Sequence, residues 1–208
     1  MRTEILQAQL PAAIEKALKI LQSGGLVAFP TDTVYGVGAL AFDNAAIESI
    51  YPAKERPIEK AIPILIGDMD SLDLVTDHIP DMARIFAARF WPGPLTCILS
   101  KKQTLPPAVS ATPTVAVRIP DHPDALTLLH TAGPMAVTSA NISGKPSPST
   151  AQEVYEQLGG RIPLILDGGK TFGGIPSTLV DCTGEKPVIL REGPIKLDEL
   201  LAALYIFQ

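Results

Sequence analysis

The sequence predicts a single α/β domain built around a mixed, twisted β-sheet. Short apolar runs with the length of buried strands alternate with segments whose apolar residues recur at helical spacing. The alternation lacks a strict strand–helix–strand rhythm, and several strands carry polar residues, which favours a mixed sheet over a purely parallel one. The 208 residues contain no internal repeat and no long linker, and 46% of them are apolar, enough for a substantial core.

The N-terminal third begins with the clearest helix. Its apolar residues fall at i, i+3, i+4 and i+7 over 14–21, and Gly24-Gly25 can end it. The run Leu26–Phe29 follows as a buried strand. Asp43 can cap a second helix, which we expect Pro52 to end or bend.

The remaining elements follow from the same patterns. Apolar runs bring the total to roughly seven strands, at Ile62–Ile66, Leu95–Leu99, Val115–Arg118, Met135–Thr138, Leu164–Leu166, Thr178–Asp181 and Val188–Leu190. Helical spacing or capping predicts helices at Asp81–Phe90, at Pro123–His130, after a capping box at Thr150–Glu153, and at Leu197–Leu204. Lys101–Thr114, with three prolines, is expected to be a surface loop.

Composition excludes several classes of protein. A net charge of −5 argues against broad, non-specific binding to nucleic acid. No apolar run approaches the ~20 residues that cross a bilayer, and the N-terminus lacks the order of a signal peptide, so we expect a cytoplasmic protein without membrane contact. Cys97 and Cys182 are isolated and are expected to be buried thiols. The three histidines lack ligand spacing, so no structural zinc is expected.

The stretch Phe29–Gly38 is the first candidate for a functional site. A buried strand leaves the core here into a proline, hydroxyls, a carboxylate and two glycines, which is a common way to build a site. An ordinary strand-to-helix turn explains this stretch almost equally well. Three later segments repeat the pattern of a strand followed by a polar or cationic cluster, which favours a site.

Cations at the ends of core elements are the second signal. Lys54, Arg56 and Lys60 fall within seven residues, and Arg118 and Arg191 each follow a buried strand. A buried guanidinium normally needs an anionic partner. That partner can be an internal carboxylate, but five such cations in an acidic chain favour an anionic ligand.

Hydroxyl and amide side chains near strand ends suit the same ligand, although capping and turns explain any single one of them. They are Thr31, Thr33, Thr114, Thr138, Ser139, Asn141, Ser143, Ser147 and Ser177. The chain lacks a P-loop, a dinucleotide fingerprint and a nucleophile elbow. This inventory predicts a site that binds anions and neutralises developing charge, without a covalent nucleophile.

Taken together, the motifs closely resemble the YrdC/TsaC family. They run in family order from near residue 10 to residue 195, as Pro30-Thr31-Asp32-Thr33-Val34-Tyr35-Gly36-Val37-Gly38, Lys54-Glu55-Arg56-Pro57, Trp91-Pro92-Gly93-Pro94-Leu95-Thr96, Val115-Ala116-Val117-Arg118-Ile119-Pro120, Thr138-Ser139-Ala140-Asn141-Ile142-Ser143-Gly144, Ser147-Pro148, Asp167-Gly168-Gly169, Pro176-Ser177-Thr178 and Leu190-Arg191-Glu192-Gly193.

The resemblance implies an L-threonylcarbamoyladenylate synthase. Such an enzyme joins L-threonine, bicarbonate and ATP and releases pyrophosphate, and a separate transferase complex then modifies tRNA to N6-threonylcarbamoyladenosine. The implied fold, over residues 1–208 as one domain, is an open twisted sheet around a large, positively lined cavity. Mg²⁺ is expected to arrive with ATP, without a protein-made metal site.

The resemblance also assigns residues. It places Thr33, Tyr35, Arg118 and Val137 at threonine, with Arg118 on its carboxylate, although a core position explains Tyr35 equally well. It places Lys54, Arg56 and Lys60 at the phosphates or bicarbonate, with Lys54 and Arg56 catalytic. Thr114, Ser139, Asn141, Ser147 and Arg191 would hold the rest of the nucleotide. Turn capping is expected for Asp32, ahead of contact with a metal-bound water.

Two positions depart from the family pattern, because Lys60 and Leu65 stand where longer relatives often have asparagine and histidine. Without the C-terminal domain of those relatives, the chain would be a short form with a more open cavity. The alternative function is a non-catalytic RNA-binding module, or at least weak RNA binding, through the same cationic concavity. A carbamoyl-transfer enzyme acting on another amine is a third interpretation.

Overall fold

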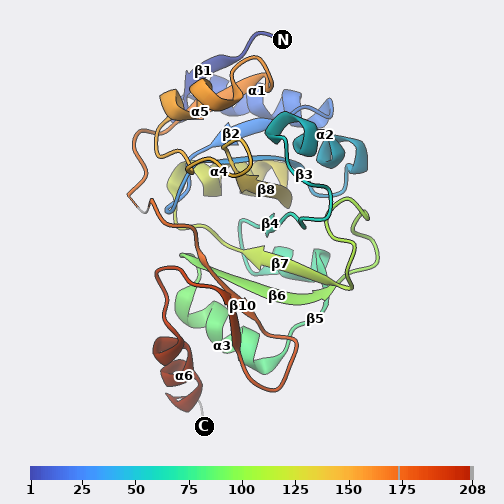
Figure 1. Cartoon of the computed structure of the whole chain (residues 1–208), viewed down its shortest axis with the longest axis vertical. Helices are drawn as coiled ribbons and strands as arrows, with labels where there is room; N and C mark the ends of the chain where they lie inside the picture. Colours follow the sequence, from blue (N-terminus) through green and yellow to red (C-terminus); the bar gives the residue numbers. More distant parts are fainter. Residues whose placement is uncertain (173, 207–208) are drawn as a thin grey trace.

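The computed structural model describes residues 1–172 and 174–206 and places them around one sheet (Figure 1). Within these residues the sheet has eleven strands, in the order β1-β9-β2-β3-β8-β4-β7-β6-β10-β11, with β5 paired to β6. The strands are β1 (Glu4–Gln7), β2 (Val27–Phe29), β3 (Gly36–Leu40), β4 (Ile64–Leu65), β5 (Thr76–His78), β6 (Leu95–Lys101), β7 (Thr114–Arg118), β8 (Met135–Ser139), β9 (Leu164–Asp167), β10 (Thr178–Asp181) and β11 (Val188–Arg191).

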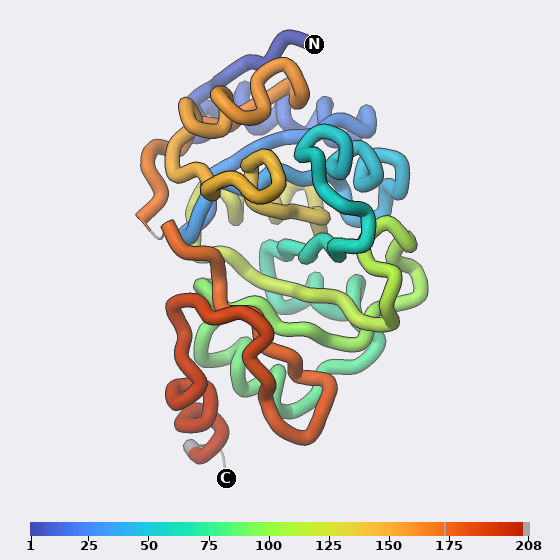
Figure 2. Tube along the Cα trace, viewed as in Figure 1, coloured from blue at the N-terminus to red at the C-terminus, as the bar shows by residue number. Residues whose placement is uncertain are grey.

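The sheet is mixed, as the sequence predicts. Strand pairs β1–β9, β2–β9, β4–β7 and β6–β10 are parallel, whereas β2–β3, β3–β8, β4–β8 and β6–β7 are antiparallel. The centre of the sheet is therefore assembled from strands far apart in the sequence. The tube in Figure 2 shows the early blue strands beside the later yellow and orange segments, so that polar residues from distant motifs meet.

Helices cover the sheet at both ends. They are α1 (Pro11–Gln22), α2 (Asn44–Lys54), α3 (Asp81–Phe90), α4 (Pro123–Ala132), α5 (Ala151–Leu158) and α6 (Leu197–Ile206), with a 3₁₀ turn η1 at Asp70–Leu74. In Figure 1, α1, α2, α4 and α5 surround the upper part of the sheet, and α3 and α6 lie together at its lower end. The prediction for α3 agrees with the structure at both ends.

Caps define where several helices begin. The Asp43 carboxylate accepts a hydrogen bond from Ala46 N at 3.0 Å, as expected for the N-cap of α2. Thr150 Oγ1 accepts from Glu153 N at 3.2 Å, and the Glu153 carboxylate accepts from Ser149 N at 2.6 Å. The capping box is thus present, with its return bond one residue earlier than the usual pattern.

Several sequence predictions were wrong. The expected count of about seven strands missed β1, β3 and β5, and the predicted strand Ile62–Ile66 shrinks to the two residues of β4. Of the two effects expected of Pro52, ending or bending α2, the first was wrong, because the helix continues to Lys54 and stops where Glu55 has φ 53°. The loop expected over Lys101–Thr114 is present over 102–113, between β6 and β7, but it does not lie wholly on the surface, because Leu105 and Val109 are buried in the core.

The strand β3 was missed because its glycines are poor strand formers. The structure explains why glycine is needed: a Cβ on Gly36 would lie 2.7 Å from Val137 Cγ1, and one on Gly38 would lie 2.4 Å from Ala136 O. Both contacts are with the neighbouring strand β8, so the glycines allow the close pairing of β3 with β8. The prediction for the cysteines is confirmed, since Cys97 and Cys182 are buried free thiols.

No helix in residues 1–172 and 174–206 has both the length and the apolar character needed to cross a membrane.

Candidate functional site

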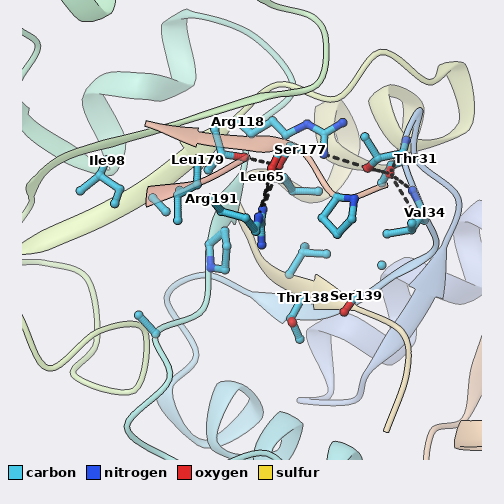
Figure 3. A pocket seen from close by; sticks show the side chains of 18 of the residues that line it. Thr31, Val34, Leu65, Ile98, Arg118, Thr138, Ser139, Ser177, Leu179 and Arg191 are labelled. Atoms are coloured by element: carbon cyan, nitrogen blue, oxygen red, sulfur yellow. Dashed lines mark hydrogen bonds between the residues drawn. The ribbon is translucent and has the colours of Figure 1, made fainter. Parts of the chain in front are cut away.

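A cavity of about 470 Å³ opens on one face of the sheet, where β3, β4, β6, β7, β8 and β10 meet. Figure 3 shows side chains from both halves of the sheet pointing into it. The lining residues are Thr31, Thr33, Val34, Gly36, Arg56, Ala61, Pro63, Leu65, Thr96, Ile98, Ser110, Thr112, Thr114, Ala116, Arg118, Val137, Thr138, Ser139, Pro176, Ser177, Leu179 and Arg191. Residues from several of the predicted motifs therefore line one cavity.

Three arginines from different parts of the chain line this cavity. Arg56 follows α2, Arg118 ends β7 and Arg191 ends β11. In the part of the chain that the structure describes, only Arg118 of the three forms an ion pair. The positive charges of Arg56 and Arg191 are therefore left for a ligand to neutralise.

Arg56 and Arg191 are held by neutral oxygens. Arg56 Nη2 donates to Ala61 O at 2.8 Å, and Arg191 Nη2 donates to Ser177 O at 2.9 Å. Burial lowers the pKa of Arg191, and the positive charge of Arg118 lowers it further. This second cause indicates that the two guanidinium groups lie close enough to repel each other, which an anion between them would relieve.

Arg118 has the internal anionic partner that the sequence analysis left open. Its Nη2 donates to the carboxylate of Asp32, Nη1 donates to Thr33 Oγ1 at 3.0 Å, and Nε donates to Gly93 O at 2.9 Å. Burial lowers the pKa of Arg118, and Asp32 opposes this effect. The expectation that Asp32 caps its own turn was wrong, because its carboxylate binds Arg118 and the backbone N of Asp121 instead.

Hydroxyl groups surround the arginines. Of the expected ones, Thr31, Thr33, Thr114, Thr138, Ser139 and Ser177 line the cavity. The sequence analysis missed Thr96, Ser110 and Thr112, which also line it. The signal for Thr96 was present in β6: Cys97 and Leu99 are buried in the core, so Thr96 and Ile98 must face the other side of the strand.

Lys54 is not among the lining residues, which corrects the expectation that its ammonium points into the cavity. Its side chain is 1% exposed, and Nζ donates to the backbone carbonyls of Ser139 and Asn141. Burial, and then the positive charge of Arg56, lower the pKa of Lys54 to about 7. Lys54 therefore links the end of α2 to the end of β8 and to Asn141, which follows it.

Three other predicted nucleotide contacts also lie outside the cavity lining, namely Lys60, Asn141 and Ser147. Lys60 is exposed, and its backbone carbonyl accepts from Arg56 Nε at 3.3 Å. The Asn141 amide donates to Ile142 O and Lys145 O, while its buried Oδ1 has no hydrogen-bond partner among the residues that the structure describes. An acceptor in that state has unused capacity for a donor or a cation.

Tyr35 does not form a wall of the cavity, so the alternative of a core tyrosine is the correct one. Its side chain is 0% exposed, and its hydroxyl donates to Gly169 O at 2.6 Å. Burial, reinforced by the charge of Asp167, raises the pKa of Tyr35. Val137 lines the cavity as predicted, beside Leu65 and Gly36.

The lining suits an elongated anion. None of the lining residues, all within the described ranges, is an aspartate or a glutamate, whereas three are arginines and nine are threonines or serines. Arginine binds carboxylate and phosphate, and hydroxyls donate to their oxygens without adding charge. Elsewhere in residues 1–172 and 174–206 there is no group of three or more His, Cys, Asp or Glu side chains placed to hold a metal ion.

Comparison with known proteins shows the family of the chain. Residues 19–193 match the family model Sua5_yciO_yrdC, which carries the description "Telomere recombination". A threonylcarbamoyl-AMP synthase of Pyrococcus abyssi is 45% identical over 189 residues, which are 90% of this chain and 56% of that protein. A protein of Mycobacterium tuberculosis named putative threonylcarbamoyl-AMP synthase is 39% identical over 197 residues, 94% of this chain and 91% of that protein.

Solved structures share the fold. The crystal structure of P. abyssi Sua5 complexed with L-threonine has a TM-score of 0.93 and 41% sequence identity, and the match covers 98% of this chain and 61% of that one. E. coli YciO has a TM-score of 0.84 at 26% identity, over 95% of this chain and 99% of that one. The chain thus spans little more than half of the longer relatives and nearly all of the shorter ones.

Proposed function

The chain belongs to the Sua5/YciO/YrdC family, and we propose that it makes L-threonylcarbamoyl-AMP from L-threonine, bicarbonate and ATP, with release of pyrophosphate. The observation that carries the proposal is the cavity in which Arg56, Arg118 and Arg191 converge without a carboxylate among the lining residues. A site for a triphosphate and an amino-acid carboxylate needs several cations in one enclosed space.

Threonine would occupy the end of the cavity near Arg118. This guanidinium uses three of its five N–H groups on Asp32, Thr33 and Gly93, which leaves two N–H groups for a carboxylate. Leu65 and Val137 would supply apolar contacts for the side-chain methyl group. The L-threonine complex of the P. abyssi relative supports threonine as the amino acid that is bound.

The triphosphate would lie between Arg56 and Arg191, with hydroxyls from β7 and β8, including Thr114 and Ser139, around it. Mg²⁺ would enter bound to ATP. A site built only from the lining residues would offer it neutral oxygens without a carboxylate, so the phosphates would have to supply most of its ligands.

The reaction depends on alignment of the two substrates more than on covalent catalysis by the protein. The amine of threonine would add to CO₂ derived from bicarbonate, losing a proton and giving an N-carboxylate. An oxygen of this carbamate would attack the α-phosphorus of ATP, forming a P–O bond as the bond to pyrophosphate breaks. The arginines would hold two anions in line and neutralise the charge that spreads over the phosphorus centre.

Arg56 is therefore the proposed catalytic cation. Lys54 could join it, because its ammonium has three N–H groups and the two carbonyls that hold Nζ occupy only two of them. Burial lowers the pKa of Lys54, and an approaching triphosphate would oppose this effect and favour the protonated form. Lys60 and Ser147 remain candidates for outer contacts with ATP.

The product would pass to a tRNA-modifying transferase complex, because a mixed carbamate–phosphate anhydride is an activated acyl donor. The direct test is pyrophosphate release by the purified protein. We expect release only when ATP, threonine and bicarbonate are all present, with a product of the mass of threonylcarbamoyl-AMP. Pyrophosphate release at the same rate without threonine would rule the assignment out. Strong turnover with another amine would identify that amine as the acceptor.

A further inference from the structure

Glu55, directly after α2, has a backbone conformation that residues with a side chain disfavour. Its φ of 53° and ψ of 41° lie in the left-handed region, and among the described residues it is the one non-glycine residue with a positive φ. Glycine usually occupies this region, because a Cβ crowds the backbone there. Local strain of this kind tends to occur at functional sites.

The hydrogen bonds around Glu55 form a Schellman motif. Arg56 N donates to Tyr51 O at 2.9 Å, which closes a six-residue turn. Glu55 N donates to Pro52 O at 3.3 Å, which closes the shorter turn inside it. Glu55 holds the left-handed position of the motif, which is usually filled by glycine, and the chain changes direction there.

This change of direction brings Lys54 and Arg56 to the same region. In a continuing helix, two residues add about 200° of rotation, so Arg56 would project from the side of α2 opposite to Lys54. Instead, Lys54 Nζ donates to Ser139 O on β8, and Arg56 lines the same cavity as Ser139. Burial is the main cause of the lowered pKa of Lys54, and the charge of Arg56 adds to it, which indicates that the two cations are close.

The side chain of Glu55 does not line the cavity. Its Oε1 lies 2.7 Å from Arg161 Nη2, and the side chains of Glu55 and Arg161 are 60% and 40% exposed. An ion pair that is this exposed contributes little to stability. What residue 55 supplies to the site is therefore its backbone conformation, and its carboxylate is dispensable.

We propose that Glu55 is a positioning residue, whose left-handed backbone turns Arg56 into the cavity where a polyphosphate binds. This inference rests on the proposed function, in which Arg56 meets the triphosphate of ATP. Arg56 Nη2 also donates to Ala61 O at 2.8 Å, so its guanidinium is oriented from both ends before the ligand arrives. A cation that is oriented in advance needs no rearrangement during the reaction.

The test compares three substitutions at position 55. Glu55→Gly permits the left-handed conformation without strain, and Glu55→Gln removes only the charge. Glu55→Val opposes the conformation, because a β-branched residue is an outlier at positive φ. The matched control is Arg161→Met, which breaks the ion pair and leaves residue 55 unchanged. Pyrophosphate release by the full chain gives kcat and the KM for ATP and for threonine, and calorimetry gives the binding of tripolyphosphate.

We expect Glu55→Val to lower kcat/KM for ATP about tenfold or more and to weaken tripolyphosphate by a similar factor, with the KM for threonine within about twofold. Glu55→Gly, Glu55→Gln and Arg161→Met should match the parent. An equal loss in Glu55→Gly and Glu55→Val would show that the side chain is required. Parent-like values in Glu55→Val would show that the conformation is dispensable. Either result would overturn the proposal.

If Glu55→Val does not fold, Glu55→Thr replaces it, because threonine is β-branched but polar, and the same two results decide. Binding of tripolyphosphate requires no catalysis, so it orders the variants even in an inactive protein. A parent that binds tripolyphosphate but releases no pyrophosphate from ATP, threonine and bicarbonate would refute the proposed function, whereas equal binding by the parent, Glu55→Gly and Glu55→Val would refute the role of Glu55.

Discussion

Arg118 and Asp32 form an ion pair at the wall of the cavity, with only 6% and 15% of their side chains exposed. The two residues are 86 positions apart in the sequence, and their contact joins the loop after β2 to the end of β7. The same carboxylate accepts from Asp121 N at 3.1 Å. Asp32 therefore both compensates the charge of Arg118 and fixes where its remaining N–H groups point.

Asp32→Asn should destabilise the protein strongly. The change leaves the guanidinium of Arg118 without its anion in a buried position, and breaking such a pair costs about 3 kcal/mol of unfolding free energy. The matched control is Glu4→Gln, which breaks the Glu4–Lys16 pair, where side-chain exposure is 43% and 42%. That change should cost little, because both side chains are exposed to solvent. Urea unfolding measures both, and equal losses would contradict the role of Asp32.

Arg191→Met should impair the use of ATP without destabilising the fold. Within the described residues, the guanidinium of Arg191 donates only to the carbonyl and hydroxyl of Ser177, so its charge is available to a ligand. Removing a preorganised charge contact lowers kcat/KM by about 100-fold or more. The control Arg84→Met changes an exposed arginine on α3 that does not line the cavity. Normal pyrophosphate release by Arg191→Met would place ATP elsewhere.

Lys54 gives the unfolding free energy a pH dependence of known sign. Burial lowers the pKa of Lys54 from 10.5 to about 7 in the folded chain. Between these values the unfolded chain binds the extra proton, so stability rises with pH through this window and is lost as the pH falls back to 7. The slope is at most about 1.4 kcal/mol per pH unit.

The measurement is urea unfolding at several values of pH between 7 and 10. Relative to the parent, Lys54→Met should lack this rise, and the control Lys19→Met, at an exposed position on α1, should keep it. A parallel pH dependence of the parent and Lys54→Met would show that Lys54 keeps its ordinary pKa in the folded protein.

Elements with a strong local pattern could be predicted from the sequence. The bounds of α3 and β10, and the caps of α2 and α5, agree because periodicity and capping chemistry act within a few residues. The strands β1, β3 and β5 could not be predicted. They are short, and all three contain polar residues or glycines, which form a strand only through pairing with other segments, β9 in the case of β1.

The cationic side chains of the site also differ in how well their directions could be predicted from the sequence. Arg118 ends β7, whose Val115 and Val117 are buried, so its entry into the cavity follows from the pattern. Arg191 also lines the cavity, but the expectation that it follows a buried strand was wrong, because most of β11 is exposed.

The direction of the Lys54 side chain could not be predicted from the sequence. It depends on how the last turn of α2 meets the backbone carbonyls of Ser139 and Asn141, which lie 85 and 87 residues later in the chain. Tyr35 was ambiguous for the same reason, since its partner Gly169 lies 134 residues away.

At Gly36 both the pairing of β3 with β8 and the shape of the cavity require a residue without a side chain. It lines the cavity on β3, and a Cβ there would lie 2.7 Å from Val137 Cγ1 on the paired strand. Gly36→Ala must therefore displace Val137, which also lines the cavity. Overpacking of this kind costs about 1–3 kcal/mol, and it should also raise the KM for threonine.

The double variant Gly36→Ala/Val137→Ala tests this explanation, because the second change removes the methyl group that the first one meets. The unfolding free energy of the double variant should exceed the value expected by adding the two single effects, a coupling that only residues in contact display. The control is Gly184→Ala, where the nearest atom to a new Cβ is Lys186 O at 3.9 Å. Strict additivity at Gly36 and Val137, with a raised KM, would mean that Gly36 is required by the ligand itself and that its contact with β8 is secondary.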